Sequence, residues 1–148
     1  MKGQVSTELL VIIGLVLLLF IPLLVLVYFK ANESNQQVSA YQAQLATSRL
    51  AYLANSVGSL GSNTTVRTEV FIPKDTVSME LKNSGNGAEV ILSLEDNYGK
   101  NDVVEIIRYP IKNPKQLAAS TSSGGWMRVK ISADYSGGKG VVDIVREN

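Results

Sequence analysis

The sequence predicts an α+β protein, in which a long N-terminal hydrophobic α-helix is followed by a small antiparallel β-sandwich or barrel. Three observations support this prediction. Leu9 to Phe29 is a run of 21 residues without Lys, Arg, Asp or Glu. After this run, apolar residues continue to recur near the helical period, and from Thr64 the period changes toward two. We therefore expect the helix over residues 4–61 and a β-rich globular head over residues 62–148.

The apolar run at 9–29 has the length of a membrane span. At about 1.5 Å per residue, a helix over this run is roughly 31 Å long, about one hydrocarbon core. Pro22 should kink the helix mildly, and Gly14 offers a small face to a neighbouring helix. Lys2 on one side, against Lys30 followed closely by Glu33 on the other, favours the N-terminus inside and the C-terminus outside. The run is too long for a conventional cleaved secretory signal, so an uncleaved signal-anchor is the simplest interpretation.

The residues before the apolar run carry a more specific pattern. A carboxylate at the mouth of a membrane helix, here Glu8, is costly unless it has a partner. With Gly3, Gln4 and Ser6 it forms a short basic leader, a Gly, and then Gln-x-Ser-x-Glu entering an apolar helix. This stretch resembles the class III signal of archaeal type IV pilin precursors. Ile12 stands where that family often has Leu.

The resemblance implies a processing step and a set of partners. A prepilin peptidase would cleave between Gly3 and Gln4, so that residues 1–3 form the leader peptide and Gln4 becomes the new N-terminus. Cleavage would create a positive amine at the start of a helix, where the helix dipole disfavours positive charge. Glu8 could offset that amine in its own chain or in a neighbour. Pairing between subunits would then set the axial register of a filament, because a buried charge without its partner is strongly disfavoured.

Beyond the apolar run, the helix carries two apolar stripes. One consists of Val38, Tyr41, Leu45 and Tyr52, and the other of Ala46, Leu50, Leu53, Val57 and Leu60. Two stripes suggest two packing partners, the head domain and neighbouring helices in a filament core. One broad amphipathic face buried on the chain's own domain is the alternative. The helix should end near Gly58 or Gly61.

The head is expected to contain six short strands. Period-two alternation and Gly-, Asn- and Pro-containing turns place them at about Thr65–Ile72, Val77–Lys82, Glu89–Leu94, Val103–Tyr109, Met127–Tyr135 and Val141–Val145. This pattern fits a sheet packed on a helix or an immunoglobulin-type sandwich, both of which the resemblance implies. It does not choose between them.

Composition argues against enzymatic chemistry. The chain has no His and no Cys, so it lacks the usual general base near neutral pH and the commonest zinc ligands. Its formal net charge of +1, without a basic patch, makes nucleic acid an unexpected partner. We expect no enzyme and no cofactor.

Three further features have structural interpretations. The oxygen-rich stretch from Glu95 to Asp102 could hold calcium, but its Lys100 and irregular spacing favour a solvated hairpin. The stretches 85–87 and 137–140 are interpreted as turns, not as phosphate loops. The single Trp126 is expected in the core, with an exposed contact position as the alternative.

Two sequons, Asn32-Glu33-Ser34 and Asn63-Thr64-Thr65, make Asn32 and Asn63 candidate N-glycosylation sites. Asn32 lies close to the membrane or to a filament wall, where access could fail. Asn63, at the junction of helix and strand, is the better candidate.

Two functional hypotheses follow. The first is a structural subunit of an archaeal type IV pilus-like surface filament, serving adhesion. Its partners would be the peptidase, a pilus assembly platform, the membrane and other copies of itself. It would reside in the cell membrane before assembly and in an extracellular filament afterwards, with the head outside. The second is a membrane-anchored, pilin-like accessory or binding protein that does not polymerise in bulk.

Overall fold

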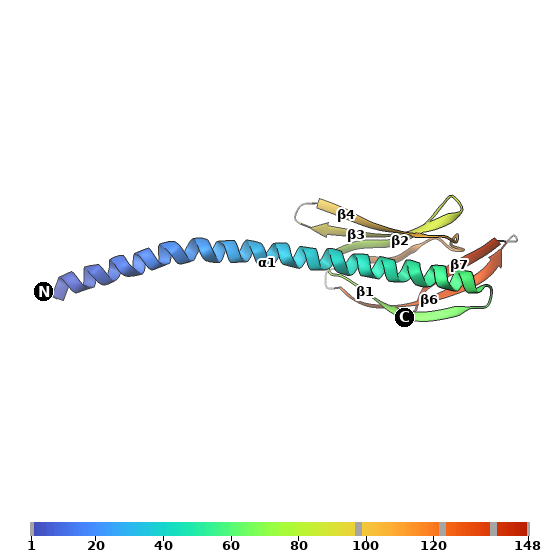
Figure 1. Cartoon of the computed structure of the whole chain (residues 1–148), viewed down its shortest axis with the longest axis horizontal. Helices are drawn as coiled ribbons and strands as arrows, with labels where there is room; N and C mark the ends of the chain where they lie inside the picture. Colours follow the sequence, from blue (N-terminus) through green and yellow to red (C-terminus); the bar gives the residue numbers. More distant parts are fainter. Residues whose placement is uncertain (1, 97–98, 122–123, 137–138, 148) are drawn as a thin grey trace. The chain divides into compact units, whose positions relative to one another are not determined.

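A computed structural model describes residues 2–96, 99–121, 124–136 and 139–147. One long helix, α1 (Lys2–Leu60), comes first (Figure 1). The chain divides into two compact units. One comprises the described residues up to Gln37, and the other comprises those from Val38 onward. The second half of α1 therefore belongs to the head. Seven strands follow the helix: β1 (Thr65–Ile72), β2 (Thr76–Ser84), β3 (Gly87–Asp96), β4 (Gly99–Ile107), β5 (Gln116–Thr121), β6 (Gly125–Ser136) and β7 (Lys139–Glu147).

The strands form two separate sheets. One has the order β1-β6-β7 and the other the order β4-β3-β2-β5, and all neighbours in each sheet pair antiparallel. The predicted α+β fold is therefore confirmed, and the described strands form a two-sheet sandwich. The largest buried side chains come from both sheets and from the helix, which makes one shared core: Leu50, Met79, Leu81, Leu92, Ile107, Ile131 and Ile144.

The second half of α1 lies along the side of the sandwich between β1 and β4 (Figure 1). Small residues on its inner face, Ala43, Ala46 and Ala54, are buried in the shared core. Polar side chains fasten its flanks. The Ser48 hydroxyl donates to the Glu105 carboxylate on β4 at 2.8 Å, and the Arg49 guanidinium donates to Thr68 Oγ1 on β1 at 3.1 Å. The helix thus closes one open side of the sandwich.

The helix ends close to the predicted position. Its last residue is Leu60, and the next, Gly61, has a φ of 91°. That left-handed conformation is the usual C-terminal stop of a helix and suits glycine because glycine has no Cβ. Gly58 does not end the helix. It lies inside α1, where the ring of Tyr109 covers the place that a side chain would fill.

Six of the seven strands overlap the predicted ranges, and the fourth ends at Ile107 instead of Tyr109. The strand β5, Gln116–Thr121, was missed. It is short, contains only one large apolar residue, Leu117, and follows a segment with two prolines, Pro110 and Pro114, so its sequence resembles a loop. Its pairing partners on β2, among them Met79, make it a strand through tertiary contacts.

Candidate assembly surface

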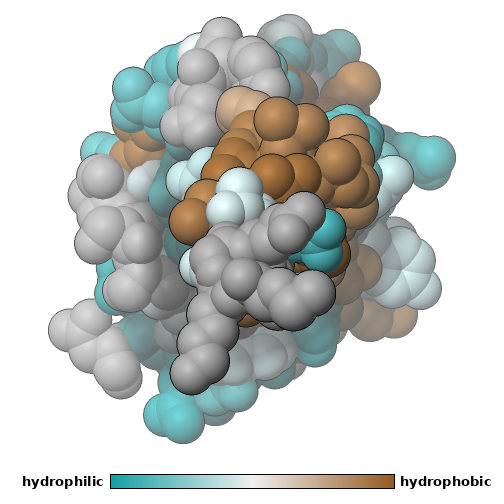
Figure 2. All heavy atoms as spheres, turned by 90° about the vertical axis from the view of Figure 1, so that its left-hand side faces the viewer, coloured by the Kyte–Doolittle hydropathy of each residue, from teal (hydrophilic) through white to brown (hydrophobic). Residues whose placement is uncertain are grey.

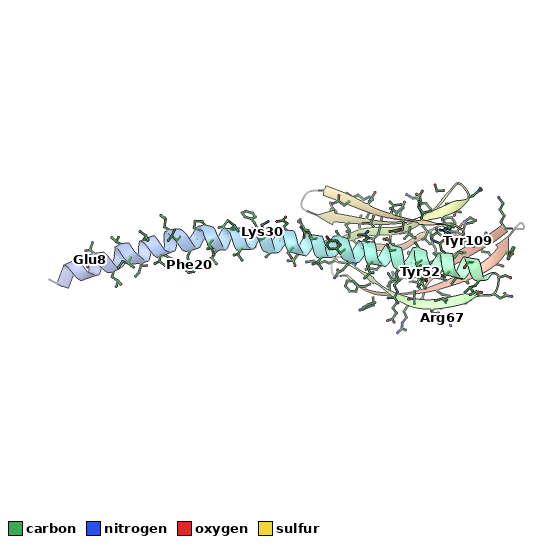
Figure 3. All side chains as sticks on the ribbon, in the orientation of Figure 1. Glu8, Phe20, Lys30, Tyr52, Arg67 and Tyr109 are labelled. Carbon is green, nitrogen blue, oxygen red and sulfur yellow. The ribbon has the colours of Figure 1, made fainter. Side chains whose placement is uncertain are left out.

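The first half of α1 presents apolar side chains on every side. Each of the large apolar residues between Leu9 and Phe29 is 45–70% exposed within the chain. Figure 3 shows these side chains, from Glu8 past Phe20 to Lys30, projecting outward around the helix. In the space-filling view toward this end, brown hydrophobic atoms gather at the surface (Figure 2). Within the described residues, α1 is the one helix long and apolar enough to cross a membrane.

The charged residues flanking this apolar segment differ in their partners. Lys30 Nζ and Glu33 Oε2 form an exposed ion pair at 2.7 Å, one turn apart on the helix. Glu8, at the other end, is exposed and makes no hydrogen bond or ion pair with any described residue. Gly3 and Gln4, the predicted cleavage position, are helical, and the structure does not describe their side chains. Glu8 is therefore a carboxylate without a partner in its own described chain.

The two stripes predicted on the second half of the helix separate clearly by burial. In the inner stripe, Leu50 and Val57 are fully buried against the sheets and Leu53 is half-buried, while Leu60 at the helix end is exposed. In the outer stripe, which consists of Val38, Tyr41, Leu45 and Tyr52, the last three are each 71% exposed. Figure 3 shows Tyr52 on the helix beside the head. The alternative of one broad face buried on the head is wrong, because the outer stripe has no cover within the chain.

The expectation that Trp126 lies in the core is wrong. Its side chain is 68% exposed on β6, where it pairs across the sheet with Phe71 of β1. The two rings contact edge to face, with their centroids 5.4 Å apart. Strand alternation contains the signal for this placement. Val129, Ile131 and Ala133 face inward, so Trp126 must share the outer face with Arg128 and Lys130.

Trp126 and Phe71 contribute to a groove that sequence reasoning missed. Together with Leu45 of the outer stripe they form its walls, and the groove has a volume of about 340 Å³. Ala46 and Val70 complete the apolar lining, and among the described residues Arg49 is the single charged one that lines it. We name this depression, between the helix and the β1–β6 pair, the aromatic groove.

The two sequon asparagines are both exposed. Asn32 lies on α1, in the first compact unit. Asn63 lies in the short turn between α1 and β1 with a φ of 67°, and its backbone N–H donates to the Ala133 carbonyl at 3.2 Å. The Asn63 backbone is therefore anchored to β6 while its side chain faces solvent, and Thr65 of the same sequon begins β1.

The stretch from Glu95 to Asp102 forms the hairpin between β3 and β4, as expected, with residues 97 and 98 outside the described part. The Ser93 hydroxyl donates to Asp102 Oδ1 at 2.6 Å, which occupies one of the oxygens considered for calcium. Among the residues that the structure describes, no three His, Cys, Asp or Glu side chains gather as a metal site. Residues 85–86 form the turn between β2 and β3, whereas residues 137 and 138 lie outside the described residues.

Ion pairs lie on the outer surface of the β1-β6-β7 sheet. Arg67 pairs with Glu147 at 3.0 Å, and Arg128 with Glu69 at 2.8 Å. The Arg128 guanidinium donates a hydrogen bond to the Glu69 carboxylate, and this bond raises the pKa of Arg128 above its ordinary value. Figure 3 shows Arg67 pointing away from the sandwich. These pairs neutralise much of the charge beside the aromatic groove.

Comparison with protein-family models, with curated proteins and with solved structures finds no match for this chain. Its function is therefore inferred from the surfaces described above.

Proposed function

We propose that the protein is a structural subunit of an archaeal type IV pilus-like surface filament, serving adhesion, that assembles through its N-terminal helix. The observation that carries this proposal is the division of α1 into covered and uncovered apolar surfaces. The head has a complete core of its own, to which α1 contributes its inner stripe. The segment from Leu9 to Phe29 and the outer stripe remain uncovered.

Two environments could cover the apolar segment. Lipid would cover it before assembly, because an apolar helix satisfies its own backbone hydrogen bonds in a membrane. Outside the membrane, exposed apolar surface on this scale is unfavourable in water, at roughly 25 cal/mol per Å². Equivalent helices from other copies offer the matching apolar surface. The outer stripe would extend the same contact toward the head, so the filament core would comprise residues from both halves of α1.

Glu8 supports the proposal through its lack of a partner. A carboxylate placed among packed apolar helices needs a counter-charge, since an unpaired buried charge is strongly destabilising. Cleavage after Gly3 would supply one by creating an amine at Gln4, one turn from Glu8 in sequence. Pairing of Glu8 with the amine of a neighbouring copy would fix the axial stagger. A prepilin peptidase and a membrane assembly platform are the partners that this sequence of events requires.

The N-terminus of the chain in sheared surface filaments tests the proposal. We expect mass spectrometry to find this chain in the filament fraction, beginning at Gln4. Replacing Glu8 by Gln should reduce filament yield by roughly tenfold or more, because it removes the charge that specifies register and leaves the buried amine unpaired. Glu33→Gln is the matched control. It removes an exposed carboxylate from the same helix, outside the apolar segment, and should leave filaments intact.

Recovery of the chain only from membranes, with residues 1–3 still attached, would contradict the proposal. So would a Glu8→Gln variant with unchanged processing, fibres and subunit stagger. Recovery of processed chain from membranes in the absence of fibres would support an anchored accessory protein instead. The self-contained sandwich is compatible with that role, because its core does not need a neighbouring copy.

A further inference from the structure

Two apolar features of the head have no partner within the chain. The first is the aromatic groove, with Leu45, Phe71 and Trp126 as its walls. The second is a ridge on the outer face of β4, which consists of Val104 and Ile106. Ile106 is 69% exposed, and Val104 pairs across the sheet with Ile91 of β3, which broadens the apolar base of the ridge. We name this feature the β4 ridge.

The groove and the ridge lie on opposite flanks of α1. The groove opens on the β1 side, where Arg49 bonds to Thr68. The ridge lies on the β4 side, where the Asn55 amide donates to the Ile106 carbonyl at 3.4 Å. A single head therefore cannot place its own ridge in its own groove. A second copy beside it can.

We infer that the β4 ridge of one head docks into the aromatic groove of the next copy, as a head-to-tail contact that deepens the filament proposed above. The groove is open, and its lining is apolar apart from Gln42 and Arg49. Branched aliphatic side chains that contact aromatic rings bury apolar area on both partners. The proposal rests on the filament function for its biological setting, whereas the contact itself is a property of the head.

Charge at the two rims is complementary. Arg49 is the cation that lines the groove, and its bond to Thr68 uses only one of its five N–H donors. Glu89 of β3 is paired in register with Ile106 and therefore lies beside the ridge. Lys82, the register partner of Glu89 on the other side, forms its ion pair with Glu80 at 3.1 Å. Glu89 makes no ion pair with a described residue and is available to Arg49 of the neighbour.

The groove and the ridge lie at different positions along the axis of α1, which allows the contact to repeat from copy to copy. The groove is lined by helix residues 42–49, whereas the ridge strand bonds to helix residues Ser48 and Asn55. The centres of these two stretches differ by about six residues, or roughly 9 Å along the helix at 1.5 Å per residue. In a filament whose α1 helices run parallel, a contact between two different patches with this axial offset shifts each copy along the axis, so it repeats along a helix instead of closing into a ring. The geometry of one head thus favours a helical array.

Cysteine cross-linking of the full chain tests this contact, because the natural sequence contains no cysteine. Three variants are needed: Val104→Cys on the ridge, Gln42→Cys at the groove, and both changes in one chain, so that Ile106 and the three walls of the groove stay in place. Each is treated with a short bifunctional maleimide, both in sheared filaments and in membranes of the producing cells. The double variant should give a ladder of dimers, trimers and longer products. Each single variant should remain monomeric, and a mixture of the two single variants should stop at dimers.

The matched control joins Val104→Cys with Tyr135→Cys, since Tyr135 is an exposed aromatic residue at the other end of β6. It should give no ladder. Ile106→Cys replaces Val104→Cys as a second ridge variant that guards against misfolding. Reversing one rim charge, by Arg49→Glu or Glu89→Arg, should lower the cross-linked fraction about two- to fivefold, the range for exposed ion pairs, and reversing both should restore it.

Accessible thiols that give no ladder in the double variant would overturn the inference, as would a single variant that cross-links to itself. These outcomes are separable from failure of the proposed function. Filaments that begin at Gln4 but yield no ladder would overturn the contact alone. A ladder in membranes of cells that make no filaments would retain the contact and overturn the filament function.

Discussion

The Asn83 side chain forms two hydrogen bonds with the backbone of Ile111. Asn83 Nδ2 donates to the Ile111 carbonyl at 2.9 Å, and the Ile111 N–H donates to Asn83 Oδ1 at 2.7 Å. Ile111 belongs to the connection between β4 and β5, and it also forms a bridge to Val142 of β7. Asn83 thus completes the backbone pairing of a connection that runs from one sheet to the edge of the other.

Replacing Asn83 by Ala should destabilise the head by about 1–3 kcal/mol, because the buried Ile111 backbone would lose both partners. Asn83→Asp should be similarly harmful, since it retains the acceptor but sets an oxygen against the Ile111 carbonyl. Ser84→Ala, an exposed change on the same strand, is the control and should lie within about 0.5 kcal/mol of the natural protein. Urea unfolding of the full chain in detergent micelles, followed by circular dichroism, measures these differences. Equal midpoints for all variants would remove this role from Asn83.

Replacing Gly58 by alanine should destabilise the head, although alanine is the better helix former. Alanine favours a helix interior over glycine by about 1 kcal/mol. A Cβ at Gly58 would nevertheless overlap the ring of Tyr109, which Figure 3 shows beside this part of the head. We expect Gly58→Ala to destabilise the head by about 1–3 kcal/mol, the usual cost of overpacking.

Two comparisons isolate the steric cause. In a Tyr109→Ala background, Gly58→Ala should become neutral or stabilising, which is a strong coupling between contacting residues. Gly14→Ala, where nothing lies within 4 Å of the added Cβ, should leave unfolding of the head unchanged. A destabilisation by Gly58→Ala that persists without the Tyr109 ring would contradict the steric explanation.

Gly58 also illustrates what the sequence could and could not predict. The apolar run, the period change near Thr64 and the turn residues were sufficient for the helix and for six of seven strands. Local signals favoured a helix end at either Gly58 or Gly61, and only the Tyr109 contact explains why glycine occurs inside the helix at residue 58. β5 was missed for a related reason, since its pairing with β2 comes from tertiary contacts.

The candidate assembly surface also has a part that the sequence predicted and a part that depends on tertiary contacts. Glu8 and the two stripes were predicted from spacing, which acts locally along one helix. The aromatic groove combines residues from α1, β1 and β6. Hydrophobicity alone suggested a buried Trp126, whereas the inward-facing Val129 and Ile131 place it outside. The alternation of inward and outward side chains along β6 was therefore a better guide to the position of Trp126 than the size of its side chain.

The Lys112–Asp134 pair should make stability sensitive to acid. Lys112 Nζ contacts Asp134 Oδ2 at 2.5 Å, and the Tyr135 N–H donates to Asp134 Oδ1 at 2.8 Å. The Lys112 hydrogen bond, followed by that of the Tyr135 backbone, lowers the pKa of the Asp134 carboxyl below its ordinary 3.8. A carboxyl with a lowered folded-state pKa contributes stability above its unfolded pKa, and this contribution is lost as the pH falls through the folded value.

Asp134→Asn should therefore lower the melting temperature at pH 6, and the difference from the natural protein should shrink at pH values below 3.8. The effect at pH 6 should be small because both side chains are about half exposed. Scanning calorimetry at a series of pH values measures the difference. A difference that stays constant down to pH 2 would show that ionisation of Asp134 is not its cause.

Leu45 and Leu50 allow a matched test of the two stripes on α1. Both are leucines on the same helix, but Leu50 is 0% exposed in the core whereas Leu45 is 71% exposed on the outer stripe. Leu50→Ala should destabilise the head by about 2–5 kcal/mol through the cavity it leaves. Leu45→Ala should change head stability by less than about 0.5 kcal/mol, since its side chain is already in solvent.

Under the filament proposal, Leu45→Ala should nevertheless lower the yield of sheared filaments, because Leu45 is buried only when a second copy covers it. Urea unfolding and filament yield, measured on both variants, separate the two roles. Normal filament yield from Leu45→Ala, together with Tyr41→Ala and Tyr52→Ala, would place the outer stripe outside the assembly contact.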